Sequence, residues 1–157
     1  MADTGIDQSH SWQYRKQELA ERLRGFDVRL TAQRLAIAEV LTNATDHPSA
    51  QDVYEKVRDI LPHITRGTIY NTLNRLVECG FVRALAFPGG SRYDANLTSH
   101  INMVCTGCGA ISDILEHEDE ILLLKREMSR ASNFDIVSER LEFYGICIDC
   151  REQLVSD

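Results

Sequence analysis

Two pairs of closely spaced cysteines constrain this chain more than any other feature of its sequence. Cys105 and Cys108 form one CxxC pair and Cys147 and Cys150 form a second, with 38 residues between the pairs. Two intervening residues let both thiolates of a pair reach one tetrahedral Zn²⁺, and two pairs supply all four ligands. A closed shell of this kind leaves no position for catalysis. The spacing therefore predicts a structural zinc site.

A redox-active thiol pair is the alternative interpretation of a CxxC motif. Such pairs stand at a helix N-terminus after a strand and usually occur once per domain, so two pairs favour the metal site over an oxidoreductase. The fifth cysteine, Cys79, is expected to be a small buried apolar residue. The sequence contains no nucleophile–base arrangement, phosphate loop or catalytic carboxylate pair, and we expect no enzyme.

Length and composition are those of a folded protein with one ordinary domain or two small ones. The 157 residues are 43% hydrophobic and 26% charged. No apolar run approaches the roughly 20 residues that span a bilayer. Residues Met1–His10 contain acids and lack the apolar core of a secretory signal, so a cytoplasmic protein without membrane contact is expected.

The net charge of −7 is unevenly distributed. Residues 1–95 hold 12 Lys and Arg against 12 Asp and Glu, whereas residues 96–157 hold 5 against 12. The first part of the chain can therefore meet a polyanion through local basic residues.

Four helices are expected in that first part. Apolar residues recur at helical spacing over residues 12–24, and Thr31, Ser49 and Thr65 each precede a further run with the same spacing. Gly80 follows the fourth run as a stop signal. Phe81–Phe87 and Ser91–Asp94 then have the pattern of a hairpin. Helices followed by such a hairpin are typical of a winged-helix domain.

The sequence changes character at an expected hinge, residues 96–99. Beyond it we expect two short strands, a helix and a longer strand, at Ile101–Val104, Ala110–Leu115, Glu118–Ala131 and Phe134–Ile146. The predicted fold class is α+β, with a winged-helix DNA-binding domain over residues 1–95 and an α/β domain over residues 100–157 that contains the zinc site.

The helix after Thr65 has a polar face whose hydroxyl, amide and guanidinium groups suit base edges and phosphates. The candidate DNA-binding residues are Arg66, Thr68, Tyr70, Asn71, Asn74 and Arg75 on this helix, with Arg29 and Arg92 elsewhere in the same domain. An ordinary solvated helix face is the alternative.

His47, Asp94, His100 and Asp113 lie near the ends of expected elements. Nitrogen and oxygen ligands suit Fe²⁺, Mn²⁺ or Zn²⁺, but spacing alone does not assign these four residues to a site.

Several motifs together make the chain resemble the ferric uptake regulator (Fur) superfamily of metal-dependent repressors. They are Leu30-Thr-Ala-Gln-Arg34, His47-Pro-Ser-Ala50, Gly67-Thr-Ile-Tyr-Asn71, Ser91-Arg-Tyr-Asp94, His100 before Cys105-Thr-Gly-Cys-Gly109, and Leu141-Glu-Phe-Tyr-Gly145 before Cys147-Ile-Asp-Cys150. The match runs from about Trp12 to Cys150 in family order. The resemblance implies a homodimer on palindromic duplex DNA, with dimerisation through the C-terminal domain around a structural zinc.

The resemblance also implies a regulatory metal site at His47, Asp94, His100 and Asp113. Iron-uptake members typically have Glu at the two acid positions, whereas peroxide-sensing (PerR-like) members have Asp at both. The chain is thus expected to be a repressor that senses peroxide through Fe²⁺, with Mn²⁺ as an alternative corepressor. A regulator that senses the supply of iron, manganese or zinc is the second interpretation.

Two positions depart from the family pattern. Asn102 stands where the hinge motif usually has a second His, and an amide is a weaker ligand for Fe²⁺ than imidazole. The regulatory site is therefore four-coordinate, or is completed by Asn102 or water. Glu139 stands where many members have a His of an additional metal site.

Overall fold

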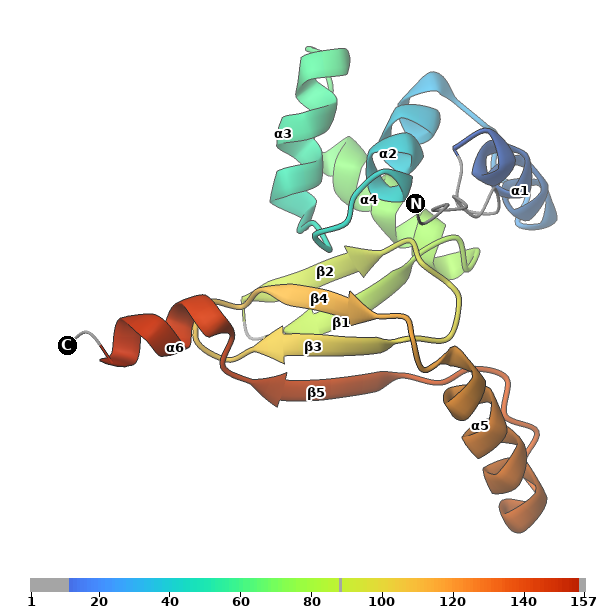
Figure 1. The fold of residues 1–157 in the computed structure, drawn as a ribbon. Helices are drawn as coiled ribbons and strands as arrows, with labels where there is room; N and C mark the ends of the chain where they lie inside the picture. Colours follow the sequence, from blue (N-terminus) through green and yellow to red (C-terminus); the bar gives the residue numbers. More distant parts are fainter. Residues whose placement is uncertain (1–11, 88, 156–157) are drawn as a thin grey trace, which may run out of the picture. The chain divides into compact units, whose positions relative to one another are not determined.

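The computed structural model describes residues 12–87 and 89–155 and divides into two compact units, one ending at Leu97 and the other beginning at Thr98. Figure 1 labels their elements in chain order. The expectation for Met1–His10 lies outside the described residues, as does Pro88 of the hairpin turn. Within the described ranges, no helix is long and apolar enough to cross a membrane.

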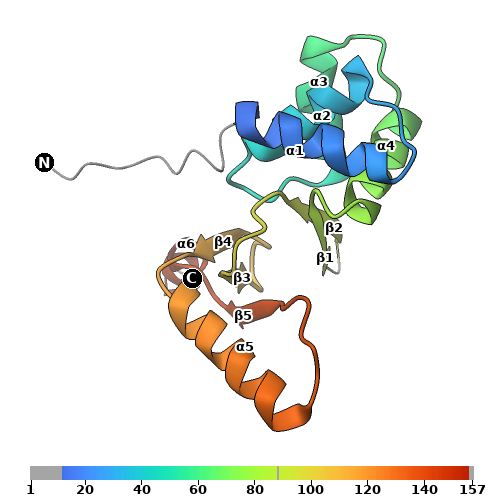
Figure 2. The ribbon, with the colours of Figure 1, turned by 90° about the vertical axis from the view of Figure 1, so that its right-hand side faces the viewer.

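The first unit begins with the four expected helices. They are α1 (Trp12–Gly25), α2 (Ala32–Thr42), α3 (Ala50–Ile60) and α4 (Arg66–Glu78), and Figure 2 shows them gathered into one bundle. The predicted caps are confirmed, because the side chains of Thr31, Ser49 and Thr65 each accept a hydrogen bond from a backbone N–H in the first turn. The helices begin where the sequence supplies an acceptor for an otherwise unpaired donor.

The helices bury one apolar face each into a common core. Its largest fully buried side chains include Leu19, Leu23, Ile37, Leu41, Val53, Val57, Ile69, Leu73, Leu76 and Phe81. Burying each such side chain contributes roughly 1.5–3 kcal/mol, which fixes the helices against one another. The opposite face of α4 is left exposed.

A two-stranded antiparallel sheet, β1 (Arg83–Phe87) and β2 (Gly90–Asp94), follows the helices. The expected start at Phe81 is wrong by two residues, because Phe81 and Val82 are buried in the helical core instead. β2 is attached to the segment before α3. The Tyr93 N–H donates to the Pro48 carbonyl over 3.0 Å, and Ser49 forms an isolated bridge with Arg92.

The second unit is a three-stranded sheet with two helices. Its elements are β3 (Ile101–Cys105), β4 (Ile111–Ile114), α5 (Glu118–Ser132), β5 (Leu141–Gly145) and α6 (Ile148–Val155). The strand order is β4-β3-β5, with β4 antiparallel and β5 parallel to the central β3. An α+β chain with a helical N-terminal unit is thus confirmed.

Two predictions for this unit need correction. The expected strand Phe134–Ile146 is shorter, because only Leu141–Gly145 pairs with β3. A parallel partner needs a crossover connection, and residues 133–140 supply part of it after α5. Phe134 and Val137 are accordingly exposed. Helix α6 was not predicted, and it begins inside the second cysteine pair.

The capping box of α3 generates a testable difference in stability. The Ser49 hydroxyl and N–H both donate to the Asp52 carboxylate, at 2.7 and 2.8 Å, and these bonds lower the pKa of Asp52 below its ordinary value of 3.8. We expect Ser49→Ala to cost about 1 kcal/mol in the free energy of unfolding at pH 7. The stabilisation of ionised Asp52 is fully present above pH 3.8 and is lost as the pH falls through the lowered pKa.

Denaturant unfolding followed by circular dichroism at pH 7 and pH 3 checks this. The control is Thr31→Ala, which removes the cap of α2, where no carboxylate is paired with the cap. The cost of Thr31→Ala should stay constant between the two pH values while that of Ser49→Ala shrinks. Equal behaviour of the two variants would contradict the prediction.

Candidate metal centres and DNA-binding face

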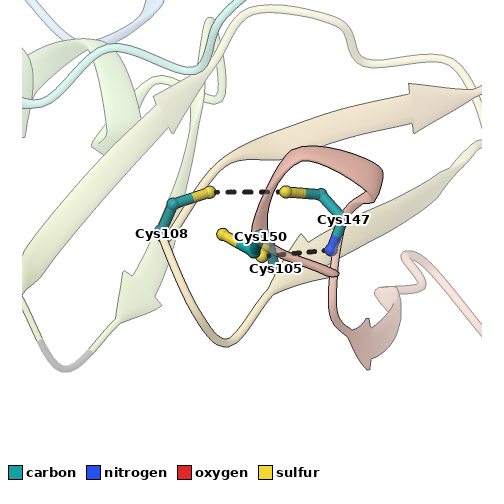
Figure 3. Close-up of side chains that lie close together, drawn as sticks. All are labelled: Cys105, Cys108, Cys147 and Cys150. Atoms are coloured by element: carbon teal, nitrogen blue, oxygen red, sulfur yellow. Dashed lines mark hydrogen bonds between the residues drawn. The ribbon is translucent and has the colours of Figure 1, made fainter. Parts of the chain in front are cut away.

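The four cysteines of the two CxxC pairs converge in the second unit. Their sulfur atoms all lie within 4.8 Å of one another, and Figure 3 shows the side chains directed toward a common centre. Cys108 Sγ and Cys147 Sγ are 3.7 Å apart. A tetrahedron with Zn–S distances of about 2.3 Å has edges of roughly 3.8 Å. The donor set and its dimensions therefore fit a Zn²⁺ ion.

Parallel pairing of β3 and β5 explains why the two pairs meet. Cys105 at the end of β3 is in register with Gly145 at the end of β5, so each strand delivers its cysteine pair to the same edge of the sheet. Gly109 closes the first turn with φ of +73°, a conformation that favours glycine. The second pair opens α6, where the Arg151 N–H donates to the Cys147 carbonyl over 3.0 Å.

Gly107 lies between the cysteines of the first pair for a steric reason. A Cβ at this position would approach Cys150 Sγ to 3.0 Å and Cys150 Cβ to 3.3 Å. The absence of a side chain at Gly107 therefore leaves room for a cysteine of the other pair.

Hydrogen bonds and sulfur–sulfur contacts shift the pKa values of Cys105 and Cys150 in opposite directions. The backbone N–H of Cys147 donates to Cys105 Sγ over 3.3 Å and, with that of Cys108, lowers the pKa of Cys105 to about 6. Interactions with the Cys147 and Cys108 sulfurs raise the pKa of Cys150 to about 12. Four thiolates this close repel one another, and a divalent cation is what allows all four to ionise.

We expect Gly107→Ala to weaken zinc binding. Overpacking of this kind costs about 1–3 kcal/mol, which corresponds to a roughly 5- to 150-fold loss of zinc affinity. The measurement is zinc release to a chromogenic chelator. Gly145→Ala is the matched control, because a Cβ at Gly145 meets nothing within 4 Å. Identical zinc release from both variants would show that the space beside Cys150 is unimportant.

Each unit also contains a buried histidine beside a carboxylate. In the first unit, His47 Nε2 lies 3.9 Å from Asp94 Oδ1. His47 has a positive φ of 48°, which is uncommon for a residue other than glycine. The bonds that attach Pro48 and Ser49 to β2 bring His47 alongside the last residue of that strand, Asp94.

In the second unit, His100 immediately precedes β3 and Asp113 lies on β4. His100 Nε2 lies 3.7 Å from Asp113 Oδ1, and Asp113 is opposite Asn102 in the sheet. His100 Nδ1 is 2.9 Å from the Thr98 carbonyl, which can only accept, so Nδ1 carries the proton and Nε2 keeps its lone pair. Asn102 Nδ2 lies 3.4 Å from the same Nε2. The tautomer is the one that a metal-binding imidazole needs.

Glu139, at the position of an additional metal ligand in many family members, has other partners here. Its carboxylate lies 2.6 Å from Lys125 Nζ and accepts a hydrogen bond of 2.6 Å from the Ser99 hydroxyl. The Lys125 ammonium group thus supplies the positive charge that a metal ion would supply in those family members. Neither Lys125 nor Ser99 was singled out by the sequence.

The candidate DNA-binding residues of α4 occupy its solvent face. Arg66, Tyr70, Asn71, Asn74 and Arg75 are exposed, whereas Thr68 is half-buried with its hydroxyl 2.9 Å from that of Thr65. Arg29 is also exposed. Two of the arginines are already paired, Arg75 with Glu78 at 2.6 Å and Arg92 with Asp52 at 3.2 Å.

Comparison with known proteins agrees with this fold and these sites. The family model described as the ferric uptake regulator family matches residues 26–144. The peroxide-responsive repressor PerR of Staphylococcus epidermidis is 33% identical over 138 residues, which cover 87% of this chain and 91% of that protein. The chain therefore belongs to the ferric uptake regulator family, as its motifs suggested.

Solved structures of family members are similar along most of their length. The ferric uptake regulator of Vibrio cholerae is 28% identical with a TM-score of 0.65, over 82% of this chain and 99% of that one. That of Pseudomonas aeruginosa, solved with manganese, is 27% identical with a TM-score of 0.69, over 82% of this chain and 96% of that one.

Proposed function

We propose that this protein is a metal-dependent repressor that binds palindromic duplex DNA as a homodimer and senses peroxide through Fe²⁺. The observation that carries the proposal is a buried histidine beside a carboxylate in each unit, His47 with Asp94 and His100 with Asp113. Either pair alone offers only two ligand atoms. Both together offer two nitrogens and two oxygens, a set that suits Fe²⁺ or Mn²⁺.

The connection between the pairs is short. Only five residues separate Asp94 from His100, so the linker spans at most roughly 20 Å, and residues 96–99 act as the hinge between a DNA-binding and a dimerisation domain. One ion shared by both pairs fixes the relative orientation of the two units. Because the ion binds that orientation in preference to others, it shifts the population toward the form that fits DNA.

Asn102 is the proposed fifth ligand. Its Nδ2 atom lies 3.4 Å from His100 Nε2, and a half-turn of the amide presents Oδ1, the atom that an amide offers to a metal. An amide oxygen binds Fe²⁺ more weakly than the imidazole usual at this position, so it favours an exchangeable regulatory ion over a permanent one. The structural Zn²⁺ is held by the four cysteines, which offer sulfur in place of nitrogen and oxygen.

The homodimer is supported by the apolar side chains that the second unit exposes. They include Leu115, Leu123, Leu124, Met128, Phe134, Val137, Phe143, Tyr144, Ile146 and Ile148. Monomeric proteins rarely expose so many large apolar side chains in a region of about 60 residues, and edge strand β5 is available for pairing.

A two-fold dimer places two α4 helices against the two half-sites of a palindrome. The proposed contact residues are Arg29, Arg66, Thr68, Tyr70, Asn71, Asn74, Arg75 and Arg92. A DNA-bound regulator without enzymatic turnover is expected in the cytoplasm.

We expect Mn²⁺ to tighten DNA binding by about 5- to 150-fold, the usual range of coupling between two sites. The probe is a duplex selected from a random-sequence pool by the Mn²⁺-loaded protein, with binding followed by fluorescence anisotropy. His47→Ala should abolish the effect of Mn²⁺ while the zinc content stays unchanged. The control is His117→Ala, an exposed histidine outside both pairs. A His47→Ala protein that still responds fully to Mn²⁺ would rule out this site.

Peroxide sensing rests on the two Asp positions, Asp94 and Asp113, and on the similarity to the PerR protein. Bound Fe²⁺ would supply the electrons that break the O–O bond of peroxide, so that one oxygen atom is added to an imidazole ligand and the other leaves as water. No thiolate in this ligand set competes for the oxidant. An imidazole of His47 or His100 that gains an oxygen atom is a poor ligand, so the two units are released and repression ends.

Peptide mass spectrometry after stoichiometric peroxide tests the signal. The mass of one oxygen atom should be added at His47 or His100 in the Fe²⁺ form and at neither in the Mn²⁺ form. If both histidines stay unmodified while the Fe²⁺ form still binds DNA, the protein responds to metal supply and not to peroxide.

A further inference from the structure

The ring of Tyr54 holds two arginine side chains at the turn between α3 and α4. The guanidinium carbon of Arg66 lies 5.1 Å from the ring centroid, and that of Arg58 lies 5.7 Å from it. Arg58 follows Tyr54 by one helical turn on α3, and Arg66 is the first residue of α4. Cation–π contacts at these distances orient the guanidinium groups and each contributes roughly 0.5–1 kcal/mol at exposed sites.

The ring itself has a fixed position. Tyr54 is partly buried against the helical core, and its neighbour Val53 is completely buried in that core. The Ser49–Asp52 capping box begins α3 one turn earlier, and Thr65 caps α4 immediately before Arg66. Arg58 and Arg66 are thus attached to a rigid platform, which lowers the conformational entropy that they lose on binding a ligand.

The charge of these two arginines is not neutralised within the described part of the chain. Arg22, Arg75 and Arg92 each form a salt bridge with a carboxylate, to Glu18, Glu78 and Asp52. Arg58 and Arg66, both exposed, contact the Tyr54 ring instead, and no carboxylate among the described residues pairs with either. Two oriented, unpaired guanidinium groups on one ring form a site for an anion with several oxygen atoms.

The position of the pair indicates which anion it meets. In a helix-turn-helix, the start of the recognition helix enters the major groove, and the phosphate backbone borders that groove. We propose that Arg58 and Arg66 bind DNA backbone phosphates beside the groove that α4 enters, and that Tyr54 is the positioning residue for both. This inference rests on the proposed DNA binding, and it adds a phosphate site to the base-reading face that includes Tyr70.

The salt dependence of DNA binding tests the site, because each lost phosphate contact reduces the slope of log K against log salt by about 0.9. Arg58→Gln and Arg66→Gln should each lower that slope by about 1.8 per dimer. Both should weaken binding to the selected duplex and to an unrelated duplex of equal length by a similar factor. Tyr70→Ala, the comparison variant on α4, should weaken binding to the selected duplex more than to the unrelated one.

Tyr54 variants test the role of the ring. Tyr54→Phe keeps the ring and should retain the parent slope, whereas Tyr54→Leu should reduce both slope and affinity toward those of the arginine variants. Adding Arg66→Gln to Tyr54→Leu should then cost less than Arg66→Gln alone, because the guanidinium group is no longer oriented. Zinc content and melting temperature confirm folding. If Tyr54→Leu does not fold, the two surface arginine variants still decide whether phosphate is bound.

The outcomes are distinguishable from failure of the proposed function. A parent protein that binds no duplex at all with Mn²⁺ overturns DNA binding itself. A parent that binds, with slopes unchanged in Arg58→Gln and Arg66→Gln, overturns the phosphate site alone. Reduced slopes in the arginine variants with an unchanged slope in Tyr54→Leu would show that the ring does not position them.

Discussion

The parallel pairing of β3 with β5 is the interaction on which the second unit depends. It brings Cys105 into register with Gly145, so that the two cysteine pairs meet beyond one edge of the sheet. At the opposite end of β3 stands His100, five residues before Cys105. One central strand therefore connects the four-cysteine site to the imidazole of His100. A zinc ion that rigidifies the cysteine end also stabilises the strand that presents His100.

Local signals in the sequence predict the first unit well, because each is a short-range physical requirement. Thr31, Ser49 and Thr65 cap the helices that follow them, since a side-chain oxygen satisfies a backbone N–H two or three residues away. The CxxC pairs are predictable for the same reason, because two intervening residues fit the geometry of a tetrahedral ion.

The second unit is less predictable because its pairing is non-local. The residues 134–140 have an apolar pattern that resembles a strand, yet they form the connection that returns the chain to lie parallel to β3. Helix α6 was missed because its first turn coincides with the second cysteine pair. The close approach of Cys150 to Gly107 and the contact of Arg66 with the Tyr54 ring join residues of different elements, which no local pattern reveals.

The sulfur donors and the nitrogen and oxygen donors suit metal ions with different roles. Four sulfur ligands within 4.8 Å of one another leave a bound ion no free position, so that ion is part of the fold. The histidines and aspartates offer nitrogen and oxygen ligands, which bind Fe²⁺ and Mn²⁺ less tightly than four thiolates bind Zn²⁺. An ion at such ligands can exchange with ions in solution. Under the proposed function, an ion held by both pairs would be retained only while the two units keep one orientation, because the pairs belong to different units. Metal binding and unit orientation would then be one equilibrium, so that a change that weakens one proposed ligand would also act on the orientation of α4.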